Sequence, residues 1–87
     1  MKIKEGFVLR KVAAHHVVLP IGKASVDFNG MISLNESGVL LWHVLEEGGD
    51  RNAMIDALLS EYDVERETAA LDVDEFIATL TKSGCIE

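Results

Sequence analysis

Cysteine is nearly absent from this 87-residue sequence, in which Cys85 is the single example. One cysteine excludes an internal disulfide and any zinc site built from several cysteine ligands. Proline also occurs once, and an apolar content of 48% is typical of a folded chain rather than a disordered one. The longest apolar run, residues 39–42, has four members, far short of a membrane span. The N-terminus lacks the apolar segment of a signal peptide. We therefore expect one cytoplasmic domain over residues 1–87, with no membrane as a partner.

Basic residues are few, and they are unevenly placed. The formal net charge is −7. Residues 1–34 carry five basic and two acidic side chains, a balance of +3, whereas residues 35–87 carry three basic and thirteen acidic ones, a balance of −10. An acidic half repels phosphate backbones, which disfavours nucleic acid as a partner. A basic or mixed-charge partner is easier to accommodate.

The spacing of apolar residues changes near residue 35, from β-branched runs to helical periodicity. The first two runs form a hairpin, although its turn contains neither Gly nor Asn. This order predicts an α+β fold, a three-stranded antiparallel sheet followed by three helices. The predicted strands cover residues 7–12, 16–21 and 30–34, and the predicted helices begin at residues 36, 51 and 66.

Helix boundaries are marked by capping residues. Asn35 and Asp50 are good N-caps, whereas Glu65, at the start of the third helix, is a poor one. Gly48 and Gly84 stand where C-terminal glycines end helices. The third helix is therefore expected to run from about residue 66 to residue 83.

The segment from residue 28 to residue 42 joins a turn, a short strand and a helix start without a linker. Asn29 and Gly30 suit a tight turn, and Asn35 begins the helix directly after the strand. If this strand is a sheet edge, an extended peptide can add to it as a further strand. The alternative is an edge protected by its shortness and by Asp27. The residues alone leave both interpretations open.

No set of residues predicts catalysis, a metal site or a bound cofactor. His15 and His16 are adjacent, so on a strand they point to opposite faces and cannot share a metal ion. His43 lies in a predicted helix without a third ligand nearby. Cys85 has an apolar context, which is typical of a small buried residue rather than a nucleophile. The sequence predicts a protein that is not an enzyme.

An acidic run lies in the third predicted helix, at residues 72–75. Only Asp72 and Glu75 share a helix face, and both flank the apolar stripe. They are expected to form a solvated rim, which is also able to pair with Lys or Arg of a docked peptide.

Motifs along nearly the whole chain resemble the PqqD family in their order and spacing. The motifs are Val8-Leu9-Arg10, Phe28-Asn29-Gly30-Met31-Ile32, Leu34-Asn35-Glu36-Ser37-Gly38, Leu41-Trp42, Leu58-Leu59, Glu61-Tyr62-Asp63-Val64, Asp72-Val73, Phe76, Leu80 and Ser83-Gly84-Cys85-Ile86. The resemblance implies a winged-helix-like domain that acts as a non-catalytic peptide chaperone. Such domains bind the leader of a ribosomally synthesised precursor peptide and present it to a modifying enzyme, frequently a radical S-adenosylmethionine (SAM) enzyme. The element at residues 28–30 resembles the broad PqqD-like group more than the pyrroloquinoline quinone pathway member.

The same resemblance places the leader between the third strand, residues 27–34, and the cleft-facing side of the third helix, residues 70–81. The peptide-binding residues expected from it are Phe28, Asn29, Gly30, Met31, Ile32, Ser33, Val73, Asp74 and Ile77.

Two other functions fit the residues. One is a winged-helix DNA-binding regulator, although the predicted helices contain few Lys or Arg residues. The other is a docking subunit of an enzyme that binds no peptide itself. An unpaired edge also permits a homodimer, in which the edge strands of two copies pair.

Overall fold

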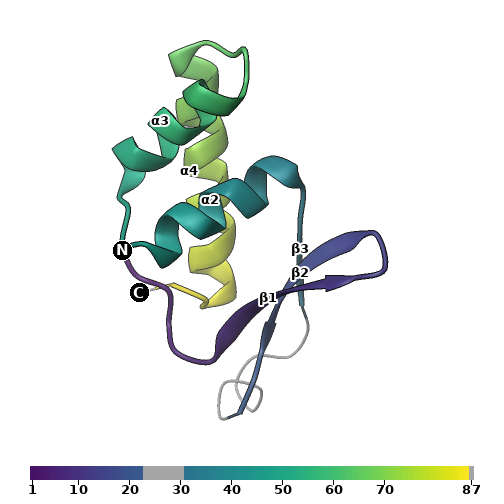
Figure 1. Cartoon of the computed structure of the whole chain (residues 1–87). Helices are drawn as coiled ribbons and strands as arrows, with labels where there is room; N and C mark the ends of the chain where they lie inside the picture. The colour runs from purple at the N-terminus through teal and green to yellow at the C-terminus, as the bar shows by residue number, and fades with distance from the viewer. Residues whose placement is uncertain (23–30, 87) are drawn as a thin grey trace.

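A computed structural model describes residues 1–22 and 31–86 of the chain. It contains three strands, β1 (Phe7–Val12), β2 (His15–Pro20) and β3 (Ile32–Leu34), followed by three helices, α2 (Glu36–Glu46), α3 (Arg51–Glu61) and α4 (Arg66–Ser83). The predicted order of three strands and three helices is confirmed. In Figure 1 the β1–β2 hairpin projects away from the helices.

The sheet is antiparallel, and its strands lie in the order β1-β2-β3. The hairpin turn consists of Ala13 and Ala14, and Ala13 adopts a positive φ of 56°. Because this turn requires a positive φ yet lacks Gly or Asn, residue type signals it only weakly. β3 begins at Ile32, whereas the predicted strand begins at residue 30. Met31 directly precedes β3, and Gly30 lies outside the described residues.

The helix boundaries follow the predicted caps. The Asn35 side chain accepts a hydrogen bond of 2.8 Å from the Gly38 N–H, and Asp50 accepts one of 2.9 Å from the Ala53 N–H. Gly84 ends α4 with a left-handed φ of 80°, which a residue with a Cβ rarely adopts. These local signals fix where each helix begins and ends.

One face of the sheet packs against the helices to form the core. Leu9, Val18 and Ile32 are neighbours on this face, because they occupy register-matched positions of the three strands. The fully buried helical side chains include Trp42 and Met54. The remaining buried core residues are Leu41, Leu45, Ile55, Leu58, Ala69, Val73, Phe76, Leu80, Cys85 and Ile86.

The two ends of the chain lie side by side (Figure 1). Ile3 and Ile86 form an antiparallel bridge, and the Lys4 N–H donates a 2.8 Å hydrogen bond to the Cys85 carbonyl. Cys85 and Ile86 therefore hold the N-terminal segment against the core.

Replacing Glu65 by Asp is expected to stabilise the fold. Glu65 has the extended backbone of an N-cap, but its side chain makes no capping hydrogen bond. The shorter Asp side chain can accept from the free amides of the first turn, a gain of about 0.5–1 kcal/mol in the free energy of unfolding. Thermal unfolding followed by circular dichroism measures this gain in stability. Glu67→Asp is the matched control, and an equal gain from it would contradict the capping explanation.

Candidate functional site

The edge of β3 that faces away from β2 carries no partner strand in the described part of the chain. Hydrogen bonding along the hairpin identifies which backbone groups this edge presents. The Ile21 N–H donates a 2.7 Å bond to the Gly6 carbonyl, so Gly6 and Ile21 form a hydrogen-bonded pair. Such pairs alternate along an antiparallel ladder, so Val17 also directs its backbone groups toward β1. Its neighbours His16 and Val18 therefore direct theirs toward β3.

Ser33 is the residue of β3 whose backbone faces outward. Leu34 and Ile32 lie opposite His16 and Val18, so they exchange hydrogen bonds with β2. Ser33 lies between them, and its N–H and C=O consequently point away from β2. An unpaired donor and acceptor on an edge strand form a template on which another extended chain can add.

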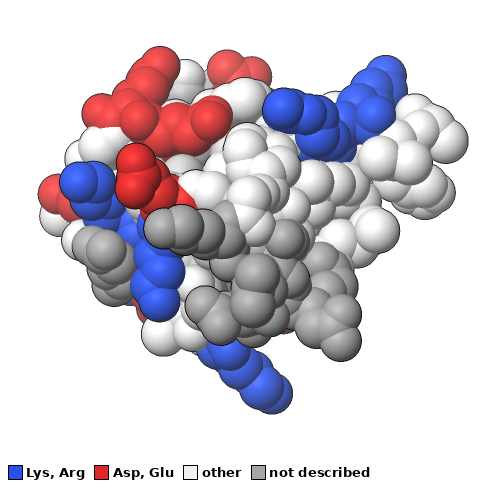
Figure 2. Space-filling view, turned by 90° about the horizontal axis from the view of Figure 1, so that it is seen from below, with Lys and Arg blue, Asp and Glu red and all other residues white. Residues whose placement is uncertain are grey.

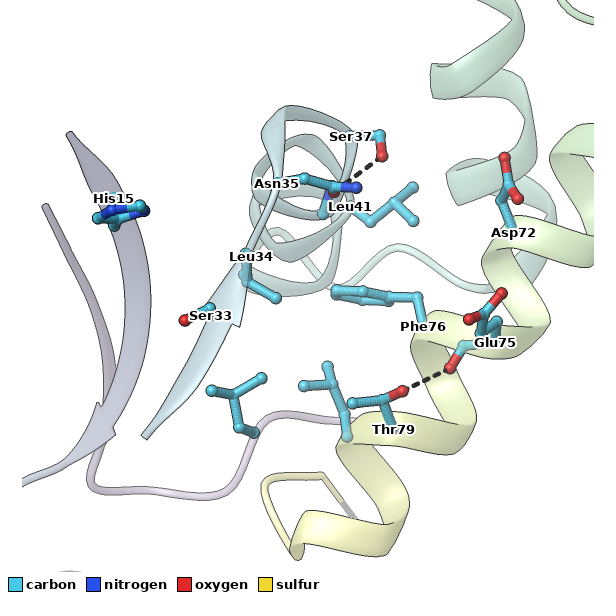
Figure 3. Close-up of a pocket in the computed structure, with 13 residues that line it drawn as sticks. His15, Ser33, Leu34, Asn35, Ser37, Leu41, Asp72, Glu75, Phe76 and Thr79 are labelled. Carbon is cyan, nitrogen blue, oxygen red and sulfur yellow. Dashed lines mark hydrogen bonds between the residues drawn. The ribbon is translucent and has the colours of Figure 1, made fainter. Parts of the chain in front are cut away.

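A groove of about 610 Å³ runs between this edge and α4, with the start of α2 at one end. We call it the β3–α4 groove. In Figure 3 Leu34 and Phe76 point toward one another from its two walls. Its lining residues are His15, Ile32, Ser33, Leu34, Asn35, Ser37, Gly38, Leu41, Asp72, Glu75, Phe76, Thr79 and Leu80.

The floor of the groove is apolar and its rim is polar. Ile32 and Leu34 share the core-facing side of β3 and line the groove together with Phe76, which is only 9% exposed. Asp72 and Glu75 stand on the α4 rim, and both are exposed. An apolar floor with a few polar groups above it is the usual make-up of a binding groove.

Glycine at position 38 allows α2 to start close to β3. A Cβ on Gly38 would lie 3.2 Å from the Leu34 Cβ and 3.2 Å from the Asn35 Oδ1. Both distances are tighter than ordinary van der Waals contact. The absence of a side chain at Gly38 therefore allows the start of α2 to lie against β3, where Asn35, Ser37 and Gly38 form the end wall of the groove.

The expected strand residues lie at the groove or beside it. Ile32 and Ser33 line the groove. Met31 directly precedes β3, and 62% of it is exposed. Phe28, Asn29 and Gly30 lie outside the described residues. The sequence-based choice of this strand therefore coincides with the open edge.

The expected α4 residues lie elsewhere on the helix. Val73 is fully buried in the core, and Ile77 packs against the core rather than lining the groove. Asp74 accepts hydrogen bonds of 2.7 and 3.0 Å from Arg51 on α3. This pairing raises the pKa of Arg51 and holds the pKa of Asp74 below its usual value. Because the folded pKa of Asp74 is depressed, the stability from this pair is present at neutral pH and is lost on acidification.

The groove-facing side of α4 consists of other residues, spaced by three and four positions. They are Asp72, Glu75, Phe76, Thr79 and Leu80. Phe76 and Leu80 belong to the core stripe as well, so the two faces of the helix overlap. The signal that identifies the face is the helical spacing of Asp72 and Glu75 beside the apolar stripe.

Charges on the helices are partly neutralised by ion pairs. Arg51 pairs with Asp74, and Arg66 on α4 donates a 3.2 Å bond to Asp56. Figure 2 shows, on the face seen from below, acidic side chains grouped together and basic side chains at separate places around them. Both arginines of α3 and α4 are thus engaged by carboxylates, and Lys82 in the last turn of α4 is the remaining basic residue of these two helices.

His15, Asp72 and Glu75 line the groove, but the described residues form no metal-binding group there. His15 and His16 are neighbours on β2 and so face opposite sides of the sheet, while His43 contacts Glu46 at 2.8 Å. Within residues 1–22 and 31–86 no three His, Cys, Asp or Glu side chains are placed to hold a metal ion. Cys85 is fully buried, and this burial raises the pKa of its thiol, an effect that Lys4 opposes. A raised pKa makes the thiol a poor nucleophile.

The family model described as coenzyme PQQ synthesis protein D (PqqD) matches residues 15–86 of this chain. Among curated proteins none matches it in sequence. No helix of the described residues is long and apolar enough to span a membrane.

Two solved structures have the same fold. TbiB1 in complex with the TbiA(beta) leader peptide superposes with a TM-score of 0.81 at 28% identity, covering 100% of this chain and 95% of that chain. Lasso peptide synthetase B1, complexed with the leader peptide, gives a TM-score of 0.76 at 22% identity, covering 95% of this chain and 92% of that chain. The second likeness concerns the fold alone.

Proposed function

Because this chain belongs to the PqqD family, we propose that it binds the leader segment of a ribosomally synthesised precursor peptide and presents it to a modifying enzyme. One observation carries the proposal: Ser33 directs its backbone N–H and C=O toward a groove that is large enough for an extended peptide. The complex of TbiB1 with a leader peptide, which shares 28% identity with this chain, supports the same role.

Leader binding would proceed by strand addition to β3. A leader residue opposite Ser33 exchanges backbone hydrogen bonds with it, and its side chain points to the outer face of the sheet, as that of Ser33 does. The leader residues before and after it point into the groove, opposite Ile32 and Leu34. Backbone pairing supplies affinity, while the groove selects among the alternate side chains.

The protein contributes binding rather than chemistry in this proposal. Its described groove residues offer an edge, an apolar floor and a carboxylate rim, with no nucleophile beside a base. Backbone pairing with a few apolar anchors corresponds to micromolar affinity, about −8 kcal/mol. A weak and reversible complex suits a protein that must hand its peptide to an enzyme.

A titration of the full chain tests the proposal. The probe is the N-terminal segment of a precursor peptide encoded beside the gene of this chain. We expect saturable calorimetric binding, with amide shifts concentrated in β3 and on the groove-facing side of α4. Saturable binding that leaves β3 unshifted, or no binding of any such leader, would overturn the proposal.

Partners beyond the leader remain predictions. A radical SAM enzyme is the modifying partner that the family resemblance implies, and co-purification of the two encoded proteins tests it. A second copy of the chain would pair through the same Ser33 edge, so a homodimer would compete with the leader. Sedimentation of the chain with and without leader measures that competition, since bound leader should shift any dimer to monomer.

A further inference from the structure

We propose that the β3–α4 groove selects leaders that carry Lys or Arg at a groove-facing position, with Asp72 and Glu75 as the specificity-determining residues. The inference rests on the proposed function, because it assumes that an extended leader lies along β3. It adds a chemical class to the peptide: an amphipathic basic side chain beside the apolar anchors.

The first observation is the electrostatic state of the groove rim. Asp72 and Glu75 both line the groove from α4, and Figure 3 places them on the wall opposite Ser33 and Leu34. Neither takes part in any of the three ion pairs formed within the described residues. Asp74, between them in sequence, points elsewhere and is paired with Arg51. Asp72 and Glu75 thus face the groove without forming an ion pair within the described residues, whereas Asp74 between them has one.

The second observation is the apolar floor directly below that rim. Phe76 and Leu34 point toward one another across the groove (Figure 3), and Ile32 also lines it. A side chain that enters from the added strand must cross this floor to reach the carboxylates. Lys and Arg have both parts that are needed, an apolar stem that covers the floor and a charged head that reaches the rim. A short polar or acidic side chain has neither the apolar stem nor the positively charged head.

Long-range charge acts in the same direction. Residues 35–87 carry a net charge of −10, and the local pair on the rim adds to this field where the leader enters. An acidic leader residue at a groove-facing position would meet like charges, which is unfavourable. A homodimer through β3 would likewise bring the Asp72 and Glu75 rims of two copies together, so the same residues favour a basic peptide over a second copy.

A display selection tests the inference. The probe is an mRNA-displayed library of random 12-residue peptides, selected on the immobilised full chain and in parallel on an Asp72→Asn, Glu75→Gln variant. The matched control is Glu61→Gln, Asp63→Asn, which removes one Glu and one Asp that are exposed and lie outside the groove. Circular dichroism verifies that all three proteins have the same helix content.

We expect peptides enriched on the wild type and on the control to combine apolar residues at alternate positions with Lys or Arg. Peptides from the rim variant should keep the apolar pattern and lose the basic preference. For an individual enriched peptide, Lys→Gln should weaken binding about threefold to fivefold on the wild type and less than twofold on the rim variant, at low salt.

The outcomes separate this inference from the proposed function. Equal basic preference on the wild type and the rim variant, or none on either, overturns the inference while strand addition stands. Enriched peptides that bind a Ser33→Pro variant as well as the wild type overturn the proposed function itself, because such peptides do not use the β3 edge.

Discussion

Replacing Ser33 by proline is expected to weaken leader binding at least tenfold while the fold is retained. The Ser33 N–H faces outward, so its loss breaks no bond to β2, and proline is tolerated on an edge strand in this orientation. The leader then loses a backbone donor and meets the proline ring. Leaving the leader's carbonyl unpaired costs about 1–3 kcal/mol, and the proline ring adds a steric cost, so the two together should lower affinity at least tenfold, or about 1.4 kcal/mol. Calorimetry with the leader measures the loss.

Two neighbouring substitutions control this experiment. Ser33→Ala removes the hydroxyl but keeps the N–H, and it should bind within about twofold of the wild type. Ile32→Pro removes a donor that β2 uses and a partly buried side chain, so it should lower the free energy of unfolding by about 3 kcal/mol. If Ser33→Pro stays folded and binds the leader normally, strand addition at this edge is wrong.

The second large effect is expected from Thr79→Trp, which fills the groove from the α4 side. Thr79 is exposed and lines the groove, and its hydroxyl bonds only to the Glu75 carbonyl one turn earlier, at 3.0 Å. An indole at this position occupies the space through which the leader side chains pass. We expect at least a tenfold loss of affinity, or about 1.4 kcal/mol, with the melting temperature nearly unchanged because no core contact is removed.

Ala78→Trp is the matched control for this substitution. Ala78 is exposed, precedes Thr79 in the same helix and does not line the groove. The two variants add the same residue type to the same turn of α4, so they differ only in the direction of the indole. Equal losses of affinity would contradict the groove as the binding site, and so would normal binding by Thr79→Trp.

The fold could be predicted closely from the sequence because its boundaries rest on local chemistry. Asn35 and Asp50 accept the amide bonds that start their helices, and Gly84 supplies the left-handed residue that ends α4. β2 covers His15–Pro20 rather than the predicted residues 16–21, since the turn places Ala13 at a positive φ that Ala does not signal. Helix capping can be predicted directly from residue type, whereas a turn that holds an Ala at a positive φ cannot.

The site could be predicted only in part. On the strand side the predicted residues include Ile32 and Ser33, which line the groove, because a short strand joined directly to a capped helix indicates an edge. The choice of Val73, Asp74 and Ile77 on α4 differs from the groove-facing set by about one position around the helix. Phe76 belongs to both the core face and the groove face, so apolar spacing alone cannot separate them. The rotation of α4 relative to β3 is set by its packing on α2 and α3, which is a tertiary effect.

Hydrogen exchange at the Ser33 amide tests the central claim most directly. The free chain should exchange this N–H quickly, while the Ile32 amide is already protected by β2. With leader at a hundred times its Kd, exchange at Ser33 should slow by about a hundredfold, because it then requires dissociation. Unchanged exchange at Ser33 in a chain saturated with leader would contradict strand addition to β3.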